Sequence, residues 1–148
     1  PVYIRRSMHV PPNSGAVRDA MPLFFELLAA ETSPAVRVVL GHFIFVYIHP
    51  YMDGNGRMGR FLMNVMLAAG GYPWTVIPVE KRDEYMTALE QASAAQDIAS
   101  FADFLADLVE ERLKGKPTAE VPTENDARVQ RPPASGVAAR PDRKGGDR

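Results

Sequence analysis

The sequence predicts an all-α domain, a helical bundle with one short β segment at its N-terminal end. Apolar residues form 46% and charged residues 24% of the 148 residues, which is the balance of one globular domain with a substantial core. Helix start and stop signals bound five helix-length stretches between residues 14 and 113. Outside the helices, extended character is expected in short runs at residues 2–4 and 74–78 and in a turn at residues 9–12.

The first elements are a strand, a turn and a helix. Val2-Tyr3-Ile4 is β-branched and aromatic, which favours a short strand. Residues 9–12 then form an extended turn rich in proline, and we interpret His9 as a turn residue outside any site. A helix is expected over residues 14–31, kinked or broken near Pro22, which lies inside it.

The stretch from residue 35 to residue 48 is apolar almost all round. Ser33 and Pro34 supply an N-cap and a first-turn proline, so we expect a helix in the middle of the domain. The same residues also favour β-strands, and the length of the run and its proline start tip the choice toward a helix.

Three more helices are expected, over residues 55–69, 79–95 and 98–113. The first of them ends well at Gly70-Gly71. Trp74 lies in the extended run that follows, and we expect it to be a core anchor. Asp97 is the expected N-cap of the last helix.

Residues 115–148 differ in character from the rest. They hold five prolines, seven basic and five acidic groups, and no Leu, Ile or aromatic residue. Such a segment cannot bury a core and is expected to be disordered. We therefore divide the chain into a folded domain at 1–114 and a tail at 115–148. Because the chain enters the β segment at once, we expect the domain to be truncated at its N-terminus.

Charge and composition exclude several classes of partner. The net charge is -1, so nothing in it indicates a nucleic-acid or membrane partner, and no apolar run reaches the roughly 18 residues of a membrane span. The chain has no cysteine, which excludes disulfides and thiolate metal sites. That composition fits a reducing compartment, and we expect a cytoplasmic protein.

The chemistry is concentrated in residues 49–60, which read His-Pro-Tyr-Met-Asp-Gly-Asn-Gly-Arg-Met-Gly-Arg. A helix is expected to begin just after the Gly-Asn-Gly turn, and its free N–H groups and positive dipole end favour phosphate. Arg57 and Arg60 are three residues apart and share a face, Asp53 can hold Mg²⁺ beside phosphate oxygens, and His49 can accept a proton from an attacking hydroxyl. The segment predicts a site for nucleoside triphosphate chemistry.

Other interpretations of the motif residues are weaker. Residues 54–59 match G-x-G-x-x-G, but an apolar helix is expected before them where a dinucleotide fold needs a strand. No Lys-Ser/Thr pair follows the glycines, so this is not a P-loop. His42, seven residues before His49, could join it and Asp53 in a metal site, but a buried, hydrogen-bonded histidine is the preferred interpretation.

Residues 49–60 resemble the signature of the Fic (filamentation induced by cyclic AMP) family, with Tyr51 in place of the usual Phe. Three runs after the motif, at residues 61–64, 71–73 and 82–85, also occur in that family. Residues 2–12 resemble the end of its substrate-binding flap, so the resemblance covers about residues 2–113. It implies a Fic-type helical bundle with a short N-terminal β flap.

The resemblance also implies protein adenylyltransfer from ATP with Mg²⁺. His49 would be the general base for a Ser, Thr or Tyr hydroxyl of a target protein, and Asp53 would bind Mg²⁺. The anion hole would be formed by Gly54, Asn55 and Gly56. Arg57 would contact the leaving pyrophosphate, and Arg60 would contact the γ-phosphate. Tyr85 and Leu89 would line the nucleotide pocket.

Departures from the family pattern bear on the transferred group. The phosphate-transferring Doc toxins carry Lys where this chain has Gly56, so nucleotidyl transfer is favoured. Family members often have Tyr in place of Met86 and Asn in place of Ser93, so the base is less well specified than the phosphate chemistry. Transfer of another nucleotide or phosphate-containing group remains an alternative, as do a non-catalytic nucleotide-binding regulator and a peptide-binding module.

Partners follow from the same resemblance. An extended segment of the target protein would pair with the flap strand Val2-Tyr3-Ile4 by β-augmentation. No Ser or Thr of the sequence begins the family's inhibitory pattern [ST]-x-x-x-E-[GN]. Inhibition would then come from a missing N-terminal helix or an antitoxin-like partner, or be absent. A homo-oligomer is compatible with the sequence.

Overall fold

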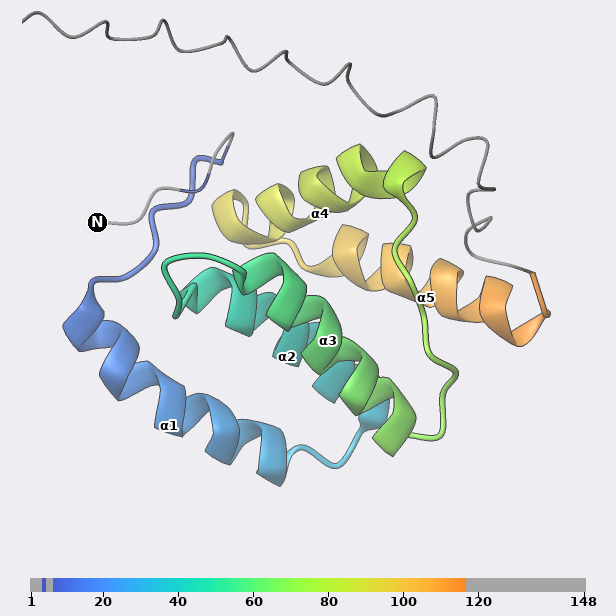
Figure 1. Cartoon of the computed structure of the whole chain (residues 1–148), viewed down its shortest axis with the longest axis horizontal. Coiled ribbons are helices and arrows are strands. Elements are labelled where there is room, and N and C mark those ends of the chain that lie inside the picture. The colour runs from blue at the N-terminus through green and yellow to red at the C-terminus, as the bar shows by residue number, and fades with distance from the viewer. Residues whose placement is uncertain (1–3, 5–6, 117–148) are drawn as a thin grey trace, which may run out of the picture.

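The computed structural model describes residue 4 and residues 7–116, and Val2, Tyr3 and the tail beyond residue 116 lie outside this range. The elements follow in the order α1 (Ser14–Ala30), α2 (Pro34–Ile48), α3 (Asn55–Ala69), η1 (Val79–Lys81), α4 (Arg82–Ala94) and α5 (Ala99–Leu113). Figure 1 shows α1 below the α2–α3 pair, with α4 and α5 above it. The described residues are helical and carry no strand, so an all-α fold is confirmed and the β flap is not, since Ile4 has no strand assignment.

Local signals set the helix ends where the sequence predicts them. The Ser33 hydroxyl accepts a hydrogen bond from the Val36 N–H at 3.5 Å, and Pro34 is the first residue of α2. Helix α1 runs through Pro22 without a break in its assignment. The expected helix over 79–95 is divided into the short 3₁₀ turn η1 and α4. The Asp97 carboxylate accepts a hydrogen bond from the Ala99 N–H at 2.9 Å, although Ile98 is the residue at the cap position of α5.

Helix α2 is central, as its apolar sequence predicts, because it contacts α1, α3, α4 and α5. The larger core cluster lies between α2, α3, α4 and α5 and includes Val38, Met63, Phe101 and Leu108. A smaller cluster of Phe24, Phe45 and Ile48 joins α1 to α2.

Trp74 is not a core anchor, and this prediction was wrong. Its side chain is 51% exposed and packs edge-on against Phe61 of α3, with ring centroids 6.1 Å apart. The residue that anchors this segment is its neighbour Thr75, which is 1% exposed. Asn64 of α3 accepts a hydrogen bond from the Thr75 N–H at 2.7 Å and donates one to the Thr75 carbonyl at 3.0 Å. The segment is therefore held through its backbone, and the indole points outward.

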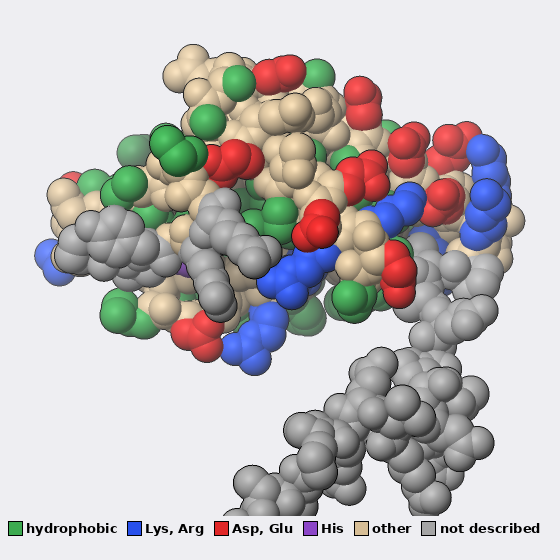
Figure 2. All heavy atoms as spheres, turned by 90° about the horizontal axis from the view of Figure 1, so that it is seen from above, with side chains coloured by type: hydrophobic (Ala, Val, Ile, Leu, Met, Phe, Trp, Pro, Cys, Tyr) green, Lys and Arg blue, Asp and Glu red, His purple; other side chains and the backbone are tan. Residues whose placement is uncertain are grey.

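The surface mixes charges of both signs. Figure 2 shows acidic side chains over much of one face, with basic side chains in smaller groups among them. Among the described residues, which are residue 4 and residues 7–116, no helix is long and apolar enough to cross a bilayer.

Candidate functional site

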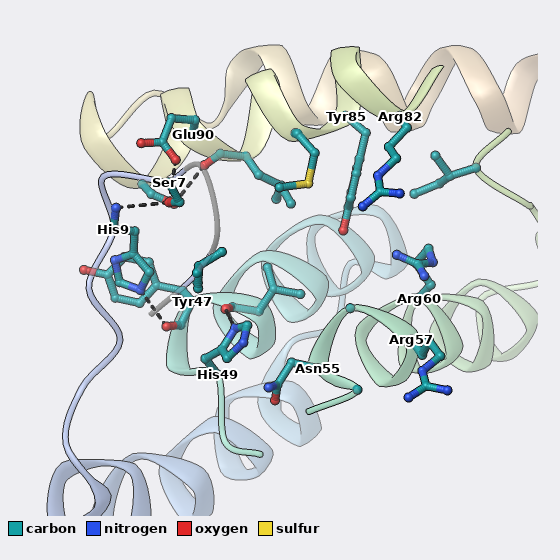
Figure 3. A pocket seen from close by; sticks show the side chains of 18 of the residues that line it. Ser7, His9, Tyr47, His49, Asn55, Arg57, Arg60, Arg82, Tyr85 and Glu90 are labelled. Atoms are coloured by element: carbon teal, nitrogen blue, oxygen red, sulfur yellow. Dashed lines mark hydrogen bonds between the residues drawn. The ribbon is translucent and has the colours of Figure 1, made fainter. Parts of the chain in front are cut away.

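One cavity of about 600 Å³ brings together all the described residues that the sequence assigned to a site. It lies between α3, α4, the C-terminal end of α2 and the N-terminal segment (Figure 3). The assigned residues that line it are Ile4, His49, Asp53, Gly54, Asn55, Gly56, Arg57, Arg60, Tyr85 and Leu89. Val2 and Tyr3 lie outside the described residues. Assigned residues up to 85 positions apart along the chain, Ile4 and Leu89 at the extremes, thus converge without any single element supplying them all.

His49 ends α2 in a left-handed conformation, with φ 53° and ψ 57°. Its N–H donates to the Phe45 carbonyl at 3.1 Å, which closes the last turn of the helix. Its ring Nδ1 lies 3.2 Å from the Val46 carbonyl oxygen. A carbonyl can only accept, so this bond requires the proton on Nδ1 and leaves the Nε2 lone pair available. This is the tautomer that a general base needs.

The turn after His49 is held by an asparagine. Asn55 is 2% exposed, its Oδ1 accepts from the Tyr51 N–H at 2.9 Å, and its Nδ2 donates to the Tyr51 carbonyl at 2.6 Å. Gly54 precedes it at φ 85°, a conformation that favours glycine. The Asn55 side chain therefore shapes the loop, and the N–H groups of the first turn of α3 remain as the anion-binding groups.

Among the residues that the structure describes, three arginines line the cavity, and they come from two helices. Arg57 and Arg60 come from α3, as the sequence predicts, and Arg82 comes from α4 (Figure 3). Arg57 is exposed and lies 3.4 Å from the Asp53 carboxylate. An exposed pair of this kind contributes about 0–1 kcal/mol to folding, so both groups can turn to a ligand at little cost.

Asp53 suits a Mg²⁺ ion that is bound largely by phosphate. Among the described residues, no group of three His, Cys, Asp or Glu side chains forms a metal site of its own. Mg²⁺ commonly takes one or two carboxylates and completes its shell with phosphate oxygens and water. A single exposed carboxylate at the mouth of an arginine-lined cavity fits that donor set.

Arg82 is a site residue that the motif does not predict. Arg82, Tyr85, Met86, Leu89 and Ser93 all line the cavity. Their spacing of three and four residues places them on one face of α4. Once Tyr85 and Leu89 are assigned to the cavity, this periodicity is the signal that would have found Arg82.

The N-terminal segment also contributes, through contacts that the sequence does not signal. Both oxygens of Glu90 are engaged, one by the Ser7 hydroxyl at 2.6 Å and the other by the Met8 N–H at 2.7 Å. His9, which we interpreted as a turn residue, stacks on Tyr47 with ring centroids 3.9 Å apart, and its Nε2 lies 2.8 Å from the Tyr47 carbonyl oxygen. Ser7, His9 and Glu90 line the cavity, so this segment forms one of its walls.

His42 is a buried, hydrogen-bonded histidine, as its preferred interpretation states. It is fully buried, and its Nδ1 lies 2.9 Å from the Gly59 carbonyl oxygen while its Nε2 lies 2.8 Å from the Tyr85 hydroxyl. Burial lowers the pKa of His42 to about 4. Burial also raises the pKa of Tyr85 to about 12, against the opposing effect of the Arg60 guanidinium. Both side chains are neutral at pH 7.

Comparison with known proteins identifies the family. The family model described as Fic/DOC matches residues 2–67. Proteins named protein adenylyltransferase Fic from Drosophila willistoni and Drosophila grimshawi are each 40% identical to this chain over 109 residues, which is 71% of the chain and 22% of either relative. The chain thus spans about a fifth of the length of these relatives.

Solved structures agree on the fold. A fragment of Fic-1 from C. elegans superposes with a TM-score of 0.68 and 26% identity, over 77% of this chain and 35% of that one. A Fic domain containing signaling protein from Bacteroides thetaiotaomicron shares the fold, with a TM-score of 0.62 and 24% identity over 72% of this chain and 50% of that one. With its motif at residues 49–60 gathered around one cavity, the chain belongs to the Fic/DOC family.

Proposed function

We propose that this chain is the catalytic part of a protein adenylyltransferase that uses Mg²⁺ and ATP. The observation that carries the proposal is that the motif groups converge around one cavity: the His49 imidazole, the Asp53 carboxylate, the N-terminus of α3 and the two motif arginines, Arg57 and Arg60. The relatives named protein adenylyltransferase Fic support the same reaction class. A cytoplasmic setting agrees with the absence of cysteine.

In the proposed reaction, a Ser, Thr or Tyr hydroxyl of a target protein attacks the α-phosphorus of ATP. The new bond joins the hydroxyl oxygen to that phosphorus, the bond to the β-phosphate oxygen breaks, and pyrophosphate leaves. His49 takes the hydroxyl proton on Nε2, since its Nδ1 proton is directed at Val46. A positioned base of this kind typically contributes about 10²- to 10⁴-fold in rate.

The remaining groups bind the triphosphate. The N–H groups at Gly54, Asn55 and Gly56 hold the α- and β-phosphates at the start of α3. Arg57 stabilises the departing pyrophosphate, and Arg60 contacts the γ-phosphate. Asp53 would hold Mg²⁺, which would neutralise charge on the phosphates. Tyr85 and Leu89 line the nucleotide side of the cavity.

The target protein would dock along the N-terminal segment. Ile4 lines the cavity, and Ser7 and Met8 are tied to Glu90, so an extended target segment beside them would bring its hydroxyl toward His49. Backbone pairing would supply affinity with little dependence on the target's side chains.

The test uses ATP labelled at either end. Purified protein is incubated with cell lysate and Mg²⁺ and with ATP carrying ³²P at the α- or the γ-position. We expect protein to become labelled from the α-position only, and the label to disappear with His49→Ala. Alanine keeps the side-chain penalty of the left-handed conformation, so His49→Ala removes the base without relieving backbone strain.

Other outcomes would identify the alternatives. Label from the γ-position would indicate phosphate transfer. Tight ATP binding with no labelled protein would favour a nucleotide-binding regulator, which requires no base at residue 49.

A further inference from the structure

A chain of hydrogen bonds crosses the back of the cavity and joins three helices. It begins at the Gly59 carbonyl of α3, passes through the His42 ring of α2 and reaches the Tyr85 hydroxyl of α4, with contacts of 2.9 and 2.8 Å. Its far end faces Arg60, the residue that follows Gly59 (Figure 3). The chain thus starts at Gly59 of α3 and leaves the Tyr85 hydroxyl beside Arg60, the next residue of the same helix.

The direction of each proton in this chain is fixed by chemistry. The Gly59 carbonyl can only accept, so Nδ1 of His42 carries the ring proton. Burial keeps this imidazole neutral at pH 7, so its Nε2 has a lone pair and no proton. Tyr85 must therefore donate its hydroxyl proton to His42. The lone pairs of the Tyr85 oxygen are left for a donor, and the Arg60 guanidinium, which can only donate, is the cation beside it.

Tight packing holds the His42 ring in place between α2 and α3. The ring stacks on Phe101 with centroids 5.4 Å apart and is fully buried. A Cβ at Gly59 would lie 2.8 Å from Val46 and 3.3 Å from the His42 ring, so the close approach of α2 and α3 requires glycine there. His42 is consequently held against the backbone of α3 one residue before Arg60.

We propose that His42 and Tyr85 are positioning residues for Arg60, with the Tyr85 oxygen accepting from the guanidinium and holding it against the terminal phosphate of the nucleotide. This inference rests on the proposed function, which places the γ-phosphate at Arg60. It changes the role of Tyr85, which is 4% exposed with its proton committed to His42, from a wall of the nucleotide pocket to a support for an arginine.

The test compares ATP with ADP, because only ATP carries the γ-phosphate. Dissociation constants for both are measured by calorimetry with Mg²⁺ for the wild type, Tyr85→Phe, Arg60→Ala and the double variant. The loss of one hydrogen bond predicts that Tyr85→Phe weakens ATP binding by about fivefold and leaves ADP within about twofold of the wild type. In the Arg60→Ala background, Tyr85→Phe should not weaken ATP binding any further, because both changes remove the same interaction.

Two further variants separate positioning from packing. Tyr72→Phe removes the hydroxyl of a part-buried tyrosine outside the cavity and should leave both dissociation constants unchanged. His42→Asn places an amide where Nδ1 stands, so it keeps the bond to Gly59 but removes the acceptor for Tyr85, and it should reproduce part of the Tyr85→Phe effect. Thermal unfolding confirms that each variant is folded.

Several outcomes would overturn the proposal. One is a Tyr85→Phe variant in which the ratio of the ATP to the ADP dissociation constant is unchanged, whether neither nucleotide or both bind more weakly. Another is a double variant in which the losses of ATP affinity from Tyr85→Phe and Arg60→Ala are additive. A wild type that binds neither nucleotide would refute the proposed function instead. In that case the ¹⁵N resonance of the Arg60 Nε–H still decides the contact, since Tyr85→Phe should shift it and Tyr72→Phe should not.

Discussion

Two asparagines of α3, Asn55 and Asn64, make similar hydrogen bonds to the backbone. Replacing Asn55 by alanine should weaken ATP binding more than folding, whereas replacing Asn64 should weaken folding more than ATP binding. Asn55 makes two bonds to Tyr51, which is 49% exposed. Asn64 bonds the Arg60 carbonyl at 3.0 Å and both backbone groups of the buried Thr75. The pair is matched in residue type, helix and burial, and it differs in what the bonds hold.

The expected free energies follow from the partners. A net hydrogen bond contributes about 1 kcal/mol, and a buried group left without a partner costs about 1–3 kcal/mol. Asn55→Ala frees the backbone groups of a half-exposed residue, whose bonds to Asn55 are only part-buried, so we expect a loss of about 1 kcal/mol. Asn64→Ala leaves the Thr75 N–H and carbonyl buried without their partners, so we expect about 3 kcal/mol, a large share of the roughly 5–15 kcal/mol of a domain.

Binding should follow the reverse order. Asn55→Ala loosens the loop that presents the first N–H groups of α3, so ATP affinity should fall by about tenfold, which corresponds to about 1.4 kcal/mol. Asn64→Ala should change it by less. Urea unfolding followed by circular dichroism gives the stabilities, and calorimetry gives the affinities. Equal losses of stability, or full ATP affinity in Asn55→Ala, would refute the assignment of the Asn55 side chain to loop geometry.

Two further predictions concern acid stability and the N-terminal segment. The pKa of His42 is lowered to about 4 in the folded state, so the unfolded chain binds the proton at higher pH than the folded chain does. The free energy of unfolding should therefore fall as the pH drops from about 6.5 to about 4. Urea titrations across this range should show a smaller fall for His42→Asn than for the wild type. Glu90→Ala removes both contacts to Ser7 and Met8 and should raise the KM for a protein target more than the KM for ATP. Glu90→Gln, which can still bond both groups, should recover most of the difference, and equal changes in both KM values would contradict a target-side role.

Helix positions were predictable because the chain marks them locally. Ser33-Pro34 starts α2, and the Gly54-Asn55 boundary starts α3 at the expected residue. The motif residues also converge as predicted, since a helix end, a short turn and a helix start constrain each other over only twelve residues.

Long-range contacts were not predictable. Glu90 meets Ser7 across 83 positions, and His42 meets Tyr85 across 43, and neither pairing has a periodic or spacing signal. Trp74 was misjudged because its composition suggests burial, whereas the backbone of Thr75 supplies the anchor and turns the indole outward. These features depend on how the helices pack, which a single sequence does not encode locally.

The backbone at His49 implies a tension between turnover and robustness. A side chain with a Cβ in the left-handed region costs about 1–2 kcal/mol, a penalty that glycine escapes and asparagine reduces. A descendant released from the need for a proton acceptor would gain by exchanging this imidazole for glycine or asparagine. Such an exchange among relatives would therefore mark proteins that have lost catalytic activity and gained folding stability.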